Sequence, residues 1–130
     1  MKISNSELAD RAKKIKLLIM DCDGVLTDGR LYFSANGEEL KVFNVKDGQG
    51  IVSWHKAGFK SAIISGRESI IVNRRATELG ISYIKQRSHD KTQCFSEILK
   101  EENEEHLTAR EELWRQEAHN LAVMYEAENL

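Results

Sequence analysis

The chain has 130 residues, with 19 Lys and Arg against 21 Asp and Glu and a formal net charge of −2. This length predicts one domain with one modest core, and the balance of 41% hydrophobic and 31% charged residues is typical of a folded protein. The apolar runs are too short for a membrane span, and the first residues lack the apolar segment of a secretory signal. Two cysteines are too few for a disulfide-stabilised secreted protein, and the near-zero net charge gives no general attraction to nucleic acid. We therefore expect a cytoplasmic domain that binds neither membranes nor nucleic acid.

Helix-forming and strand-forming segments alternate along the first 100 residues. A polar, helical lead-in at residues 4–15 precedes the apolar run 17–20, which is typical of a strand buried on both faces. Segments 30–33 and 40–44 flank the pair Asn36 and Gly37, a strong hairpin signal because both residues tolerate positive φ. Further helices are expected at residues 48–57, 69–79 and 91–100, and further strands at 60–64 and 81–84. This alternation predicts a parallel α/β sheet with right-handed crossovers, whose ligands gather at the carboxyl ends of the strands.

Composition changes near Lys100. Residues 1–99 carry 16 basic and 12 acidic residues, whereas residues 100–130 carry 3 and 9 and no glycine. Residues 108–111 have the form of a capping box, and apolar residues follow it at helical spacing. They are Trp114, Ala118, Leu121 and Tyr125. We interpret residues 1–100 as the core domain and residues 101–130 as an acidic helical tail.

The chemistry is concentrated directly after the first apolar run, where residues 21–27 read DCDGVLT. Asp21 and Asp23 lie two residues apart in an extended exit from a strand, so both carboxylates can face one cavity, and Gly24 lets the backbone turn. One carboxylate could attack phosphorus while the other protonates a leaving oxygen, and a divalent cation would offset the repulsion between Asp21 and a phosphate. Taken alone, the pattern fits a strand followed by a polar turn equally well.

Residues 21–29, DCDGVLTDG, resemble the first motif of the haloacid dehalogenase superfamily, and more narrowly that of the 3-deoxy-D-manno-octulosonate 8-phosphate phosphatases. Residues 30–48, 64–69 and 79–81 are similar to the same subfamily, so the resemblance extends from residue 15 to residue 99. It implies an α/β fold: a Rossmann-like parallel sheet of the haloacid dehalogenase type, with a β-hairpin inserted at residues 30–44.

The same resemblance implies roles for individual residues. Asp21 is the expected nucleophile and Asp23 the expected general acid/base, and the Asp21 carboxylate and the Asp23 backbone carbonyl are the expected Mg²⁺ ligands. Ser65 matches the second motif, a hydroxyl donor to the phosphoryl oxygens. Lys91 matches the third, a cation that stabilises the phosphoryl group and the nucleophile. These parts fit phosphoryl transfer by in-line attack, positioning and charge neutralisation.

Two neighbours of Ser65 complete the candidate substrate site. We expect Gly66 and Arg67 to contact the substrate, with Arg67 binding an anionic group such as a carboxylate in bidentate fashion. Three of the candidate residues also have a purely structural interpretation. Ser65 fits a helix N-cap, and Lys91 and Arg67 fit solvated surface residues. Asp47 fits the outer shell of a metal site and the N-cap of the next helix equally well.

One expected motif is missing. The superfamily normally carries a fourth motif of Gly-Asp-Asp type after another apolar strand, and this chain has no Asp after Asp90. We therefore expect a C-terminally truncated fold, with residues 100–130 as the product of a truncated or frame-altered gene. The strand that ends at Asp21 then becomes a sheet edge, which the tail helix or another subunit covers. The Mg²⁺ site should therefore be weak. The candidate substitute ligands are Glu111, Glu112 and Glu117, but a helix is the wrong support for a ligand that belongs at a strand end.

The resemblance also implies a function. It predicts a Mg²⁺-dependent phosphatase that hydrolyses 3-deoxy-D-manno-octulosonate 8-phosphate, a small sugar phosphate of lipopolysaccharide precursor synthesis, with activity impaired in this chain. A homotetramer, in which the hairpin reaches a neighbour's site, is the implied assembly. Two alternatives stay open: a catalytically inactive, phosphatase-like binding or structural subunit, and a related acylneuraminate-phosphate phosphatase.

Overall fold

The computed structural model describes residues 4–102 and 123–126 of the chain. The helices are α1 (Asn5–Ala12), α2 (Val45–Lys56), α3 (Ile70–Leu79) and α4 (Lys91–Glu101). The strands are β1 (Ile15–Met20), β2 (Tyr32–Ser34), β3 (Gly37–Leu40), β4 (Lys60–Ile64), β5 (Tyr83–Lys85) and β6 (Val123–Glu126). Within these ranges, the helices are too short or too polar to cross a membrane.

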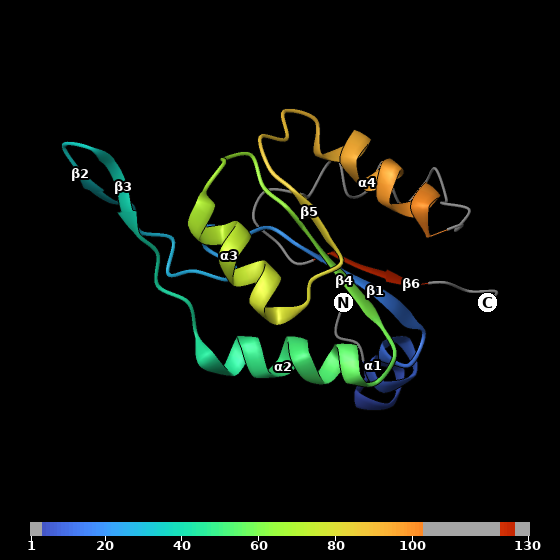
Figure 1. The fold of residues 1–130 in the computed structure, drawn as a ribbon. Coiled ribbons are helices and arrows are strands. Elements are labelled where there is room, and N and C mark those ends of the chain that lie inside the picture. The colour runs from blue at the N-terminus through green and yellow to red at the C-terminus, as the bar shows by residue number, and fades with distance from the viewer. Residues whose placement is uncertain (1–3, 103–122, 127–130) are drawn as a thin grey trace.

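The architecture is α/β, with a four-stranded sheet in the order β5-β4-β1-β6 (Figure 1). Strands β5, β4 and β1 run parallel, which confirms the predicted α/β sheet for these strands. Helices α2 and α3 cover one face of the sheet and α4 covers the other. The α4 face buries Leu17, Ile19, Ala62, Ile64, Phe95, Ile98 and Leu99. The sheet is therefore buried on both faces, as the uninterrupted apolar runs predicted.

Local sequence signals explain where the helices begin and end. Ser4 forms a capping box with Glu7 at the start of α1, and the Asp90 side chain accepts a hydrogen bond from the Gln93 amide at the start of α4. Helix α3 ends at Gly80, whose φ of 75° is the left-handed conformation that favours glycine. These signals were readable in the sequence, and the predicted helices at residues 4–15, 69–79 and 91–100 are confirmed within one to three residues.

The predicted start of the second helix was three residues late. Asn44 caps α2 by accepting the Lys46 amide on its side chain at 2.8 Å. Asp47 therefore lies in the first turn, exposed, and its interpretation as an N-cap is wrong. The asparagine was overlooked because it also ends the preceding extended segment.

The hairpin is confirmed, but its two strands are shorter than the expected segments and lie closer to the turn. Strands β2 and β3 pair antiparallel around the turn at residues 35–36 and project away from the sheet and helices (Figure 1). Of the Asn-Gly pair, Gly37 takes a positive φ, 112°, and Asn36 does not. An isolated antiparallel bridge between Thr27 and Phe43 closes the base of the hairpin.

The end of the chain corrects two predictions. Residues Val123–Glu126 form strand β6, which pairs antiparallel with β1, so the helical interpretation is wrong there and the sheet is mixed rather than wholly parallel. The edge of β1 that was expected to be covered by the tail helix or by another subunit is covered by strand β6, because an unpaired apolar strand gains ladder hydrogen bonds from an extended segment that can reach it. The rest of the predicted tail helix, with its capping box and three glutamates, lies outside the described residues.

Candidate active site

The candidate site is a tight loop at the carboxyl end of β1. The Cys22 carbonyl accepts hydrogen bonds from three successive amides, those of Val25, Leu26 and Thr27, at 3.1, 2.8 and 3.2 Å. Gly24 has a φ of 80°, so the backbone turns through a conformation that a side chain would strain. The loop thus curls around the Cys22 carbonyl and leaves the aspartates on either side of a fully buried cysteine.

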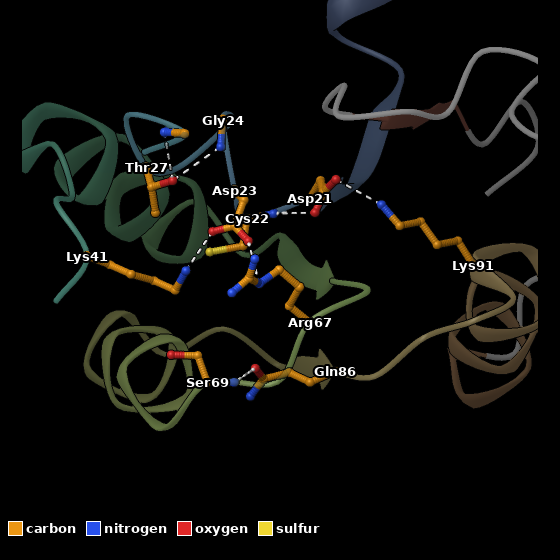
Figure 2. A network of polar contacts seen from close by, with 11 residues as sticks. Asp21, Cys22, Asp23, Gly24, Thr27, Lys41, Arg67, Ser69, Gln86 and Lys91 are labelled. Atoms are coloured by element: carbon orange, nitrogen blue, oxygen red, sulfur yellow. Dashed lines mark hydrogen bonds and ion pairs between the residues drawn. The ribbon is translucent and has the colours of Figure 1, made fainter. Parts of the chain in front are cut away.

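Asp21 is buried, with 8% of its surface exposed, and each carboxylate oxygen has a donor. The Cys22 amide donates to Oδ1 at 2.7 Å, and the Lys91 ammonium donates to Oδ2 at 2.8 Å (Figure 2). Lys91 is the first residue of α4, 70 residues away in sequence. A carboxylate so held is fixed in orientation, and the lysine offsets the negative charge that would repel a phosphate.

Asp23 lies on the other side of the loop and faces two more cations. Lys41 Nζ is 2.7 Å from Asp23 Oδ1, and Arg67 Nε is 3.8 Å from Asp23 Oδ2. Lys41 and Lys91 approach the aspartates from opposite sides in Figure 2. The Arg67 guanidinium also lies over the Phe33 ring, 5.7 Å from its centroid, so the hairpin borders the site.

The end of β4 supplies the neighbouring wall. Met20 pairs with Ile63, so Asp21 and Ser65 leave the sheet at the same edge. Ser65 is 3% exposed; its amide donates to the Lys85 carbonyl at 2.8 Å, and its carbonyl accepts the Ser88 amide at 3.0 Å. The N-cap of α3 is Ser69 instead, so the interpretation of Ser65 as an N-cap is wrong.

The remaining expected substrate residues are open to solvent. Gly66 is exposed, and a Cβ at this position would meet the Ser88 carbonyl oxygen at 3.8 Å, an ordinary contact. The Arg67 side chain is 45% exposed, within reach of Asp23. Their proposed contacts with a substrate therefore remain predictions.

Asp28 anchors the start of the hairpin to the loop that carries Asp21 and Asp23. The Arg30 amide and the Tyr32 hydroxyl donate to its two carboxylate oxygens at 3.0 and 2.8 Å. These hydrogen bonds, with the Arg30 amide as the larger influence, hold the pKa of Asp28 below its usual value.

The donor chemistry of the loop fits a hard divalent cation, although the ligand set is short. The Asp21 carboxylate and the Asp23 backbone carbonyl are oxygen donors of the kind that Mg²⁺ prefers. In the described part of the chain, His, Cys, Asp and Glu side chains form no cluster of three or more that could hold a metal. These two oxygens would therefore bind the ion together with water and substrate oxygens.

Sequence reasoning located most of this site and missed one residue. The structure brings Asp21, Asp23, Arg67 and Lys91 into one network and puts Ser65 on the adjacent strand end. Lys41 was not singled out, although it lies within the segment that resembles the family. Its position in a hairpin of mixed polar and apolar residues gave no local signal, since its partner is 18 residues earlier in the chain.

The comparisons with known proteins agree on one family. The 3-deoxy-D-manno-octulosonate 8-phosphate phosphatase KdsC of Escherichia coli is 43% identical over 95 residues, covering 73% of this chain and 50% of the relative. The chain thus spans about half the length of the curated relatives it matches. No protein-family model matches the chain.

Solved structures give the same result. A probable YrbI family phosphatase from Pseudomonas syringae pv. phaseolica 1448a is 48% identical with a TM-score of 0.73, covering 76% of this chain and 56% of that structure. The phosphatase from Moraxella catarrhalis, in complex with magnesium, phosphate and KDO, is 42% identical with a TM-score of 0.73, covering 78% and 59%.

Proposed function

Because the chain belongs to the 3-deoxy-D-manno-octulosonate 8-phosphate phosphatase family of the haloacid dehalogenase superfamily, we propose that it takes part in hydrolysis of that phosphate monoester. The products would be the free sugar acid and inorganic phosphate, in the synthesis of lipopolysaccharide precursors. The observation that carries the proposal is the buried Asp21 carboxylate, held by Lys91 at the end of β1 with Asp23 two residues on.

The geometry supports a two-step mechanism. In the first step an Asp21 oxygen attacks phosphorus, an aspartyl phosphate forms, and the bond from phosphorus to the sugar oxygen breaks. Asp23 gives its proton to that departing oxygen. In the second step Asp23 takes a proton from water, which attacks the aspartyl phosphate and releases phosphate. Lys91 and the Ser65 hydroxyl are the proposed donors to the phosphoryl oxygens throughout.

Mg²⁺ is the proposed cofactor, held by the Asp21 carboxylate and the Asp23 carbonyl. When bound, it would neutralise phosphate charge and help to orient the phosphoryl group. The M. catarrhalis structure contains magnesium together with phosphate and KDO, which supports the choice of ion.

We further propose that the protein acts as a cytoplasmic homo-oligomer, a tetramer by resemblance. The hairpin and its flanks expose four large apolar side chains on a thin ribbon that needs a surface to lie on. These are Leu31, Phe33, Leu40 and Val42, each 44 to 58% exposed.

A second candidate is a phosphatase-like binding or structural subunit without turnover. The short ligand set within residues 4–102 and 123–126 favours it, since two protein oxygens are few for an ion that demands near-octahedral coordination. An acylneuraminate phosphate is the alternative substrate within the same chemistry.

Phosphate release from a sugar-phosphate panel tests these candidates. The assay compares the 130-residue chain with Asp21→Asn and Asp23→Asn, with and without Mg²⁺. We expect preference for 3-deoxy-D-manno-octulosonate 8-phosphate, no turnover by Asp21→Asn, and a rate roughly two to four orders of magnitude lower for Asp23→Asn. Undiminished release by Asp21→Asn would refute the mechanism, and binding without release would favour the second candidate.

A further inference from the structure

The hairpin places a lysine in contact with the catalytic loop. Lys41 directly follows β3, and its ammonium lies 2.7 Å from Asp23 Oδ1. The Lys41 side chain is 2% exposed, against 25% for Asp23. Burying an ammonium group is costly unless an anion pairs with it. The ion pair therefore restrains both side chains, that of Lys41 and that of Asp23.

The backbone of Lys41 is fixed from the other side as well. Two residues further along the chain, Phe43 bridges to Thr27, the residue that closes the loop around Gly24 and Gly29 with its hydroxyl. The Thr27 hydroxyl accepts both glycine amides at 3.2 Å. Lys41 is therefore tied to the loop through its backbone neighbourhood and through its ammonium, which leaves Asp23 little freedom to rotate.

The contact also distinguishes the two oxygens of Asp23. An ammonium group only donates hydrogen bonds, so the Oδ1 that Lys41 contacts is an acceptor. Oδ2 lies 3.8 Å from Arg67 Nε, beyond hydrogen-bond distance. Of the two oxygens, Oδ2 is therefore the one that these contacts leave open toward a substrate.

We infer that Lys41 is a positioning residue that orients Asp23, so that Oδ2 exchanges the proton with the leaving oxygen of the substrate. The inference rests on the proposed function and deepens it, because it assigns a role to a hairpin residue within the same site. The hairpin then contributes to proton transfer through Lys41, in addition to bordering the site.

The role predicts a dependence on the leaving group. A sugar phosphate leaves as an alkoxide, which is strongly basic and needs a proton as its bond to phosphorus breaks. An aryl phosphate such as p-nitrophenyl phosphate leaves as a stabilised phenolate, which needs that proton far less. Misplacing Asp23 should therefore slow the first reaction and spare the second.

The test compares Lys41→Met with the parent chain on both substrates. We expect kcat for 3-deoxy-D-manno-octulosonate 8-phosphate to fall roughly 10- to 100-fold, and kcat for p-nitrophenyl phosphate to fall less than about three-fold. Lys41→Arg, which keeps a cation, should recover part of the sugar-phosphate rate. Lys56→Met, at an exposed position near the end of α2, is the matched control and should behave as the parent on both substrates. Equal losses on both substrates, or no loss on either, would overturn the inference.

A double-mutant cycle with Asp23→Asn separates this inference from the proposed function. If Lys41 acts through Asp23, then Lys41→Met should cause no further loss of sugar-phosphate turnover in the Asp23→Asn background. The urea midpoints of the same four proteins should likewise be non-additive, and this measurement needs no activity. A parent chain that hydrolyses neither substrate would refute the proposed function. Additive midpoints would refute the pairing of Lys41 with Asp23.

Discussion

Replacing Lys91 with methionine is the sharpest test of the environment of Asp21, the proposed nucleophile. The Lys91 ammonium lies 2.8 Å from Asp21 Oδ2, and the two side chains are 24% and 9% exposed. A hydrogen bond to a charged group contributes about 1.5–3 kcal/mol, and water can partly replace a lysine that is a quarter exposed, so we expect a loss near the lower end, about 1.5 kcal/mol. The kinetic loss should be larger, because removal of one donor to a transferring group typically costs about 10²–10³ in kcat.

The structure provides a matched control at the same distance. Lys60 Nζ lies 2.8 Å from Glu102, but the Lys60 side chain is 54% exposed, so Lys60→Met should cost at most about 1 kcal/mol and leave kcat unchanged. Urea unfolding and phosphate release on both variants measure the contrast. In an Asp21→Asn background the stability cost of Lys91→Met should largely vanish. Equal stability losses for the two lysines, with a fall in kcat below about ten-fold for Lys91→Met, would refute the reasoning.

Three further predictions follow from burial, charge and ligand number. Burial, with a hydrogen bond to Glu102, raises the pKa of Tyr83 from 10.0 to about 12, so the contribution of Tyr83 to stability should be lost as pH rises from 10 to 12. In urea unfolding, the Tyr83→Phe variant should lose less stability over this pH range than the parent chain. An equal loss in both proteins would count against this prediction. The chain should self-associate at micromolar concentration by light scattering, and Leu40→Ser on the hairpin should weaken association while Leu8→Ser on α1, also exposed, should not; a monomeric parent would contradict this. Mg²⁺ should bind weakly to this 130-residue chain by calorimetry and by activity titration, because no Asp follows Asp90, and saturation at micromolar Mg²⁺ would show that other residues complete the site.

The parts of the fold set by local chemistry could be predicted closely. Strand β4 has the predicted bounds, Lys60–Ile64, because a short apolar run between a glycine turn and a polar loop is typical of a buried strand. Helix α3 ends at Gly80 as expected, since glycine adopts the left-handed conformation without strain. The site followed from the same reasoning: parallel strands deliver Asp21 and Ser65 to one edge, whatever their distance in sequence.

Contacts between distant segments could not be predicted in this way. Tyr125 continues a helical spacing of apolar residues, whereas Val123 and Met124 before it also fit an extended apolar strand. Pairing with β1 makes this segment a strand. Lys41 shows the same limit at the site, because a lysine beside a hairpin is normally a solvated residue. Its burial depends on Asp23 lying opposite, which only the folded arrangement reveals.

The direction of β6 determines what this strand can contribute to the site. In a parallel strand beside β1, the carboxyl end would lie at the same edge as Asp21 and could present a ligand there. Strand β6 runs the other way: Val123 pairs with Ile19 near that edge, whereas Glu126 pairs with Ile15 at the far end of β1. Six residue steps separate Ile15 from Asp21, about 20 Å at roughly 3.3 Å per residue, so the backbone of Glu126 lies at the opposite end of β1 from Asp21. Strand β6 therefore covers the edge of β1 without bringing its own carboxyl end to Asp21, and this is the physical reason to expect a well-held Asp21 carboxylate beside a weakly held cation.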